Sequence, residues 1–379
     1  MEKVKIKNIF DFQKKSKIKA GDGFKLGEAQ YPFYTSSNEL TKSINEYLFE
    51  DESLIFGTGG LASIHFCNEK FAVSTDCFVI QPKDKKRVFS KFVYYYLSGN
   101  MNILESGFKG AGLKHISKDY LENIEIPLPN LATQQRIAAI LDQADAIIQN
   151  NRAIVQKYDQ LTQSLFLDMF GDPVRNVLDF EEIELINLIK DKNDIKCGPF
   201  GTQLSKSEYV EFGVPVWGIP QVNSLFVKKP TEYVTKKKAE ILKQYSVFPD
   251  DIVMSRKGNV GKCAIYPNNW EIGILHSDVL RIRCDKDKIS PVFLVWQFRI
   301  SRRLETQVND VSSGAIMQGI NVSKLKNILA IVPPIALQNH FAERVAMIES
   351  QKQQAQLELA KSEELFQCLL QRAFKGELN

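Results

Sequence analysis

The amino-acid sequence predicts an α+β fold in which two domains of mixed short strands and helices are separated by two long helices that pair as an antiparallel coiled coil. The first reason is an internal repeat, because residues 116–170 align without a gap with residues 320–374. The second is that both copies of the repeat end in a stretch whose apolar residues have coiled-coil spacing. The third is that strand-like runs joined by glycine-rich and polar turns precede each copy. The chain is therefore expected to alternate domain, helix, domain, helix, with an internal pseudo-two-fold relation.

The two long helices are predicted from their apolar seams. The first helix follows Pro129, with Thr133 as its expected cap, and its seam alternates spacings of four and three through Ile140, Ala144, Ile147, Asn151, Ile154, Tyr158, Leu161 and Leu165. The second seam comprises Phe341, Val345, Ile348, Lys352, Ala355, Leu359, Ser362, Phe366 and Leu369. Because both seams are narrow and flanked by polar residues, we expect the helices to pair with each other. Burial of both helices in one globular core is the alternative.

The two mixed domains share a plan. The first has an alternating strand-like run over residues 71–80 and a helix near residues 89–97, and the second has a matching strand near Asp278 and a helix over residues 293–304. The expected boundaries are 1–127 for the first domain, 128–171 for the central helical region, 172–332 for the second domain and 333–379 for the C-terminal helical region.

The composition is that of an ordinary soluble globular protein, with 44% hydrophobic and 25% charged residues in 379. The longest apolar run, near residues 328–337, is too short for a membrane span and contains Pro333 and Pro334, so we expect a cytoplasmic protein without a membrane partner. The six cysteines form no C-x-x-C pair, which favours reduced thiols over a zinc site or a disulfide framework. The net charge is +4, and its positive excess lies outside the long helices.

An enzyme would need residues that carry its chemistry, and the sequence offers few. The four histidines form no metal-binding pattern, and the segment Gly57–Gly60 lacks the spacing of a phosphate-binding loop, which favours a turn. The stretch Val332–Ile335 looks superficially like the catalytic loop of an amino-methyltransferase but lacks the acidic or amide residue before its prolines. We therefore predict neither catalytic nor metal-binding residues, and no cofactor of its own.

A DNA-binding surface requires basic residues for phosphates, and amides, hydroxyls, arginines and aromatics on loops that can enter a groove. Both mixed domains supply such residues on predicted loops. The candidates in the first domain are Lys14, Lys15, Lys17, Lys19, Tyr34, Thr35, Ser36, Ser37 and Asn38. Those in the second domain are Thr202, Gln203, Trp217, Gln221, Asn223, Ser255, Arg256, Lys257 and Asn259.

Three local motifs add to the repeat. They are the glycine-containing motif Gly110–Ser117, the Pro-Leu-Pro-x-Leu-x-x-Gln-Gln-x-Ile junction at Pro127–Ile137, and Gly198-Pro-Phe-Gly. With these motifs the whole chain resembles the specificity subunit of type I restriction–modification systems. The second copy departs from the junction motif, with Pro333-Pro334 and with His340 in place of Arg136.

The resemblance implies a non-catalytic subunit whose two target recognition domains each read one half of a split, asymmetric DNA site. It also implies docking of modification subunits and of translocating restriction subunits. S-adenosylmethionine, ATP and Mg would then be bound by those partners. Independently, antiparallel pairing of two repeated helices lets each domain present the same face to DNA. The alternatives are a DNA methyltransferase that carries its own recognition domain and a coiled-coil scaffold that does not bind DNA.

Overall fold

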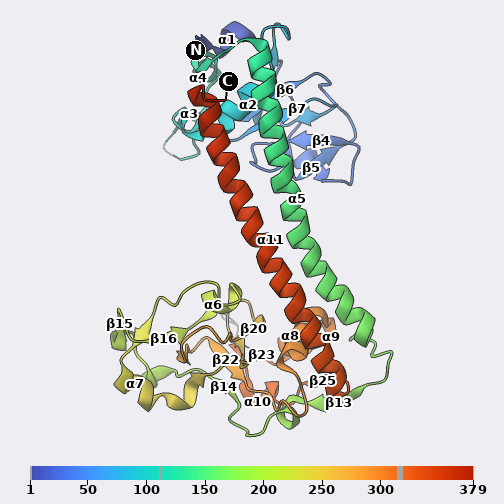
Figure 1. Ribbon diagram of the computed structural model, residues 1–379, viewed down its shortest axis with the longest axis vertical. Coiled ribbons are helices and arrows are strands. Elements are labelled where there is room, and N and C mark those ends of the chain that lie inside the picture. The colour runs from blue at the N-terminus through green and yellow to red at the C-terminus, as the bar shows by residue number, and fades with distance from the viewer. Residues whose placement is uncertain (1, 111, 314–318, 379) are drawn as a thin grey trace. The chain divides into compact units, whose positions relative to one another are not determined.

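The computed structural model describes residues 2–110, 112–313 and 319–378 (Figure 1). Ala111 of the glycine motif and the terminal residues Met1 and Asn379 of the outer predicted regions lie outside the described residues. The chain forms two compact units: unit 1 contains Met1–Ile154 and Ala355–Asn379, and unit 2 contains Val155–Gln354. Each unit therefore combines one mixed domain with one half of each long helix.

Unit 1 contains mostly short strands before its long helix. Its elements are β1 (Lys3–Lys5), α1 (Ile6–Ile9), β2 (Phe10–Phe12), β3 (Phe24–Lys25), β4 (Tyr31–Tyr34), β5 (Lys42–Ile44), β6 (Ser53–Gly57), β7 (Ile64–Cys67), β8 (Ala72–Val73), β9 (Cys77–Pro82), α2 (Ser90–Ser98), α3 (Met101–Glu105), β10 (Phe108–Lys109), β11 (His115–Ile116), α4 (Lys118–Asn123) and β12 (Glu125–Pro127). Strand β6 is buried along its whole length, as expected for a central strand covered on both faces. The expected helix near residues 89–97 is α2.

Unit 2 repeats this series with insertions. Its elements are β13 (Glu181–Glu184), β14 (Ile195–Cys197), β15 (Tyr209–Val210), β16 (Val214–Trp217), α6 (Ile219–Asn223), β17 (Tyr233–Val234), α7 (Lys236–Ile241), β18 (Ser246–Val247), β19 (Ile252–Ser255), β20 (Cys263–Ile265), β21 (Gly273–Leu275), β22 (Val279–Ile282), α8 (Pro291–Ile300), α9 (Arg302–Asp310), β23 (Ser312–Ser313), β24 (Gly319–Ile320), α10 (Val322–Leu325) and β25 (Leu329–Val332). The single helix expected over residues 293–304 is wrong. Ser301 ends α8, and its hydroxyl accepts a hydrogen bond from the Leu304 amide (3.3 Å), which starts α9.

The main sheets of the two units have the same topology. The main sheet has the order β2-β9-β6-β7 in unit 1 and β14-β22-β19-β20 in unit 2. The hairpin β10-β11 corresponds to β23-β24, and the antiparallel pair β1-β12 corresponds to β13-β25. The internal repeat therefore covers the mixed domains as well as the helices.

The long helices are α5 (Leu131–Phe170, 40 residues) and α11 (Ile335–Lys375, 41 residues). The expected cap Thr133 is wrong, because the side chain of Asn130 accepts the hydrogen bond from the Thr133 amide (2.9 Å) and α5 begins at Leu131. Asparagine is among the strongest capping residues, and here it precedes the helix directly.

The predicted seam of α11 lies on buried or half-buried positions throughout. The seam of α5 is only half right. Ile147, Ile154 and Leu161 are exposed, while their neighbours Ile148 and Thr162 are buried. Because Ile147 and Ile148 are adjacent and both apolar, the spacing alone does not show which of the two belongs to the seam.

Contacts inside each unit show that the two helices run antiparallel. In unit 1, Arg152 forms an ion pair with Glu363 (2.7 Å), and the Asn151 amide donates to the Ser362 hydroxyl (3.3 Å). In unit 2, Lys352 pairs with Asp159 (2.6 Å), and the rings of Phe166 and Phe341 meet edge to face at 5.6 Å. In unit 2, Phe166 comes after Asp159 in α5, whereas its partner Phe341 comes before Lys352 in α11. In unit 1, Arg136 comes before Arg152, whereas its partner Leu378 comes after Glu363. The expected antiparallel pairing is confirmed.

A buried glutamine joins each long helix to its mixed domain. The Gln134 side chain accepts from the Phe89 amide (2.9 Å) and donates to the carbonyls of Arg87 (3.0 Å) and Pro129 (2.8 Å). Its repeat partner Gln338 accepts from the Ser290 amide (2.8 Å) and donates to the carbonyls of Lys288 (3.3 Å) and Pro333 (2.7 Å). Both glutamines are completely buried, so each needs these partners. The repeat thus preserves a hydrogen-bond network as well as an apolar pattern.

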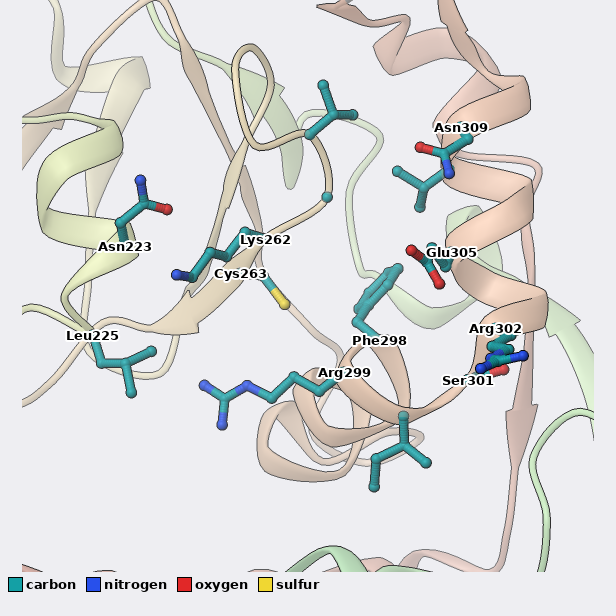
Figure 2. A pocket seen from close by; sticks show the side chains of 14 residues that line it. Asn223, Leu225, Lys262, Cys263, Phe298, Arg299, Ser301, Arg302, Glu305 and Asn309 are labelled. Carbon is teal, nitrogen blue, oxygen red and sulfur yellow. The ribbon is translucent and has the colours of Figure 1, made fainter. Parts of the chain in front are cut away.

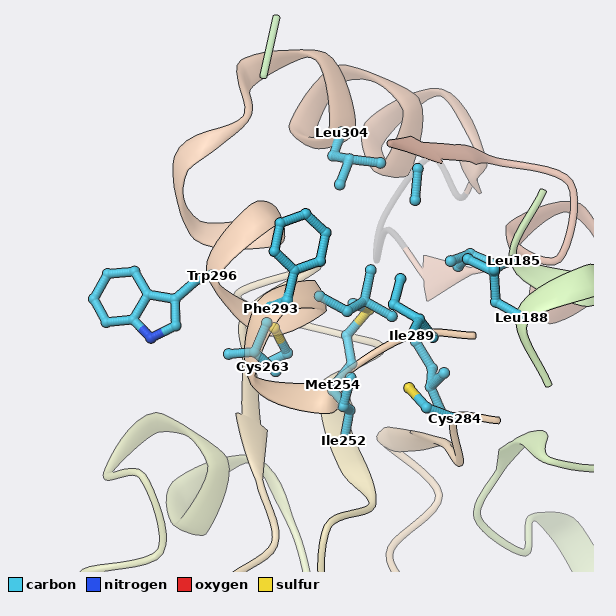
Figure 3. Packing of buried hydrophobic residues seen from close by; sticks show 14 of the residues in the cluster. Leu185, Leu188, Ile252, Met254, Cys263, Cys284, Ile289, Phe293, Trp296 and Leu304 are labelled. Carbon is cyan, nitrogen blue, oxygen red and sulfur yellow. The ribbon is translucent and has the colours of Figure 1, made fainter. Parts of the chain in front are cut away.

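The main core of unit 2 lies under α8 and α9 (Figure 3). Phe293 and Leu304 of these helices share this core with Ile252 and Met254 of β19. In unit 1, the corresponding core joins α2 to α5 and to the end of α11. In each unit this core fixes the main sheet against the long helices.

Candidate nucleic-acid interface

Backbone hydrogen bonds continue past one end of the main sheet of unit 1. The Thr58 amide donates to the Asp76 carbonyl (2.8 Å), and the Thr58 carbonyl accepts from the Ile116 amide (3.1 Å). Next to Asp76, the Thr75 amide donates to the Ile18 carbonyl (2.8 Å). These bonds bring the basic loop, the loop after β6 and the hairpin β10-β11 to one place.

The polar segment Thr35–Asn38 joins them, because it follows β4 at the same end. His65 Nε2 lies 2.8 Å from the Ser37 carbonyl, and the Ser63 hydroxyl donates to the Ser36 carbonyl (3.3 Å). A shallow hollow of about 460 Å³ is lined by residues 35–39 and by Gly59, Gly60 and Leu61. We call this surface edge 1, comprising residues 14–19, 35–38, 58–61 and the described part of 109–116.

The four lysines of residues 14–19 are exposed, whereas Ser16 between them is buried. Lys15 Nζ lies over the Phe78 ring, 5.2 Å from its centroid. No carboxylate of the described residues forms an ion pair with Lys14, Lys15, Lys17 or Lys19. Unpaired cations of this kind suit phosphate contacts.

Unit 2 has the same framework with different side chains. The Arg256 amide donates to the Asp278 carbonyl (2.8 Å), and the Arg256 carbonyl accepts from the Ile320 amide (3.0 Å). Arg256 therefore occupies the place of Thr58. Gly198 lies so close to the backbone of His276 that a Cβ atom on Gly198 would be 2.2 Å from the His276 carbonyl oxygen. Edge 2 comprises residues 198–203, 256–259 and 276–278.

Charged groups on edge 2 are partly paired. Lys257 Nζ lies 2.9 Å from the Asp278 carboxylate, and the Asp278 amide donates to His276 Nδ1 (3.2 Å). Burial raises the pKa of the Asp278 carboxyl, but the hydrogen bond from Lys257 and the nearby charges outweigh this effect and place that pKa below its usual value. The carboxylate is thus held ionised while it positions Lys257. An arginine, a lysine and a carboxylate side by side can contact guanine, phosphate and cytosine, respectively.

Comparison with known proteins finds type I restriction–modification specificity proteins, and the sequence relatives cover most of the chain. A family model described as the type I restriction modification DNA specificity domain matches residues 1–158. The MjaVIII specificity subunit of Methanocaldococcus jannaschii is 25% identical over 366 residues, covering 88% of this chain and 84% of the relative. The EcoBI specificity subunit of Escherichia coli is 24% identical and covers 88% and 75%. Together these matches indicate a type I restriction–modification specificity subunit.

Solved structures of this family share the fold. The type I restriction–modification S subunit from M. genitalium aligns with a TM-score of 0.65 at 16% identity, covering 98% of this chain and 96% of that one. A chain from a structural study of complex assembly in a type I system aligns with a TM-score of 0.56 at 14% identity, covering 99% and 98%. The predicted α+β architecture is confirmed.

Four residues of this chain that were predicted to contact DNA are buried, which corrects those predictions. Tyr34 and Trp217 are the last residues of the equivalent strands β4 and β16, and both rings pack into the core. Gln221 is buried because it accepts from the Gly218 amide (3.1 Å) and donates to the Lys229 carbonyl (3.0 Å). Ser255 is buried within β19. These side chains shape the edges without reaching a groove.

The remaining candidates divide into two groups. Thr35, Ser36, Ser37 and Asn38 lie on edge 1 with the lysines, and Thr202, Gln203, Arg256, Lys257 and Asn259 lie on edge 2. Arg256 is half-buried, since its Nε donates to the Ile320 carbonyl (3.1 Å). Asn223 lies apart from edge 2, in the cleft described next.

A cleft of about 630 Å³ opens in unit 2 beside the loop after β19 (Figure 2). Lys262 and Arg299 extend toward the side that holds Asn223 and Leu225, whereas Glu305 and Asn309 lie on the wall formed by α9. Burial raises the pKa of the Cys263 thiol to about 12, which makes this cysteine a poor nucleophile. The cleft is mainly cationic, so it could extend phosphate contacts from edge 2.

Sequence reasoning missed the loop Thr58–Leu61, which it treated as a turn, and His115 on the hairpin. The conformation is indeed a turn, since Gly60 has a φ of +83°. The missed signal is positional, because Thr58–Leu61 occupies in unit 1 the place of Arg256–Asn259 in unit 2. Among the described residues, no helix is long and apolar enough to span a bilayer, and no cluster of His, Cys, Asp and Glu could hold a metal.

Proposed function

We propose that this specificity subunit reads a bipartite, asymmetric DNA site, with edge 1 contacting one half and edge 2 the other. The observation that carries the proposal is that both units present the same backbone framework with different side chains. Thr58, Gly59, Gly60 and Leu61 stand on edge 1 where Arg256, Lys257, Gly258 and Asn259 stand on edge 2. Equivalent positions with unlike chemistry suit recognition of two different half-sites.

The proposal includes partners and a location. Modification subunits would dock on this chain and methylate the site that it selects, and restriction subunits would translocate and cut DNA. S-adenosylmethionine, ATP and Mg would be bound by those partners, and the complex would act in the cytoplasm. The M. jannaschii and E. coli relatives are specificity subunits of type I restriction enzymes, which supports this assignment.

The proposal is tested by sequencing the methylated genome of cells with and without this chain. A split methylated motif that appears only with the chain is expected. Replacing residues 1–115 by the equivalent segment of a relative should then change one half of the motif only. A change in both halves would contradict separate reading by the two units.

The purified chain alone should not methylate DNA. Incubation with labelled S-adenosylmethionine and genomic DNA measures this directly, with the assembled complex as the positive control. Label transfer by the isolated chain would favour the alternative of a methyltransferase with its own recognition domain.

A further inference from the structure

Edge 1 carries two leucines that protein packing does not explain. Leu61 and Leu113 are 77% and 79% exposed, although each belongs to a short loop of a well-packed unit. A single exposed leucine is common on a protein surface and needs no explanation. Two exposed leucines on neighbouring loops are more informative than either one alone.

Backbone pairing joins the two loops that carry these leucines. Gly59 and His115 form an antiparallel bridge, and the Gly60 amide donates to the Lys114 carbonyl (3.3 Å). Leu61 directly follows Gly60 and Leu113 directly precedes Lys114, so the two leucines flank one hydrogen-bonded pair of residues from two loops that are far apart in sequence. We call Leu61 and Leu113 together the apolar tip.

The surroundings of the apolar tip indicate its occupant. Leu61 lines the polar hollow with Thr35–Glu39, and Lys114 stands beside Leu113 in the hairpin. The four unpaired lysines of residues 14–19 belong to the same edge. An apolar tip in a basic and polar setting matches a DNA groove, where the thymine C5-methyl is the apolar group available to aliphatic side chains.

We propose that Leu61 and Leu113 are specificity-determining residues that contact thymine methyl groups in the half-site read by unit 1. This inference rests on the proposed function and adds that this half-site contains a thymine recognised through its methyl group. Edge 2 also has an exposed aromatic side chain, Phe200, beside Thr202 and Gln203.

The test uses the chain assembled with its modification subunits and duplexes that carry the methylated motif. Each thymine of the half-site is replaced in turn by deoxyuridine, which removes only the methyl group. Loss of one contacted methyl should weaken binding by the wild-type complex roughly fourfold, the effect of exposing about one buried CH₂ group. In the Leu61→Ala and Leu113→Ala complexes, binding should be weaker and this sensitivity to deoxyuridine should disappear.

Leu26→Ala is the matched control, since Leu26 is also an exposed leucine of unit 1 but lies outside edge 1. The inference is overturned if no thymine of the half-site is sensitive to deoxyuridine, or if both variants keep the wild-type sensitivity. It is also overturned if the variants fail to assemble with the modification subunits, because the tip would then be a protein contact. By contrast, absence of any methylated motif that depends on the wild-type chain would defeat the proposed function itself.

Discussion

Replacing the buried Gln338 by methionine should destabilise unit 2 strongly. Methionine has a similar length but removes the acceptor of the Ser290 amide and the donor to the carbonyls of Lys288 and Pro333. A buried donor left without a partner costs about 1–3 kcal/mol, and the two carbonyls add less because each has a second lone pair. We expect Gln338→Met to lower the free energy of unfolding by about 2–4 kcal/mol.

The tryptophans provide a local probe for this experiment. All three, Trp217, Trp270 and Trp296, lie in unit 2. Urea unfolding followed by tryptophan fluorescence should show a midpoint lowered by about 1–2 M, given a slope of about 2 kcal/mol per molar urea. Gln134→Met should shift the far-UV circular dichroism transition by a similar amount, but the tryptophan transition less.

Gln351→Met is the control, because Gln351 is an exposed glutamine on α11 within unit 2. Its midpoint should stay at the wild-type value. If Gln338→Met and Gln351→Met have equal midpoints, the hydrogen-bond network does not hold the helix to the mixed domain, and the reasoning is refuted.

Other predictions concern recognition, pH and spacing. Arg256→Ala should relax base choice in one half-site, at about 1–3 kcal/mol, whereas Lys15→Ala should weaken binding to all sequences and reduce its salt dependence, as titrations at several salt concentrations would show. Burial lowers the pKa of His65 despite its hydrogen bond to a backbone carbonyl, so the His65 imidazole binds a proton at higher pH in the unfolded chain than in the folded one. Unit 1 should therefore lose stability as pH falls below about 6.5, the usual pKa of histidine. His65→Gln should reduce this pH dependence of the thermal unfolding temperature. Inserting seven residues into both seams, 140–165 and 341–369, should preserve helix pairing and lengthen the gap between the half-sites of the methylated motif by about three base pairs. Three added base pairs also rotate one half-site relative to the other by about 100°, which should lower activity. Inserting them into one seam should impair folding.

The long helices were predictable because their signals are periodic and repeated. The error in the α5 seam was avoidable, since the ungapped repeat carries the correct α11 seam onto α5. Val345, Lys352 and Phe366 correspond to Leu141, Ile148 and Thr162, which the structure places on the buried side. The repeat therefore held more information about burial than the local spacing did.

The residues proposed to face DNA were harder to predict because composition does not report side-chain direction. Tyr34 and Trp217 have residue types typical of interfaces, but each ends a strand with its ring in the core. Leu61 has no polar or basic group and Thr58 has only a hydroxyl, so only the hydrogen bonds that align them with Asn259 and Arg256 place them on an edge. Which side chains lie on an edge is determined by strand pairing between segments that are distant in the sequence. A local sequence pattern contains no information about that pairing.

The two ends of the chain are held by the same stretch of backbone and helix. The Glu2 carbonyl accepts from the Leu128 amide (2.9 Å), the Arg136 guanidinium donates to the Leu378 carbonyl (3.2 Å), and Val4 and Leu378 belong to one core. A short linker from residue 378 to residue 2 would give a circular polypeptide that contains the two copies of the repeat. Cutting that circular polypeptide between residues 171 and 180 would give a circular permutant in which the second mixed domain precedes the first, and every strand pairing would be kept. For this fold, the order of the two mixed domains in the gene could thus be reversed without changing the strand pairing of either domain.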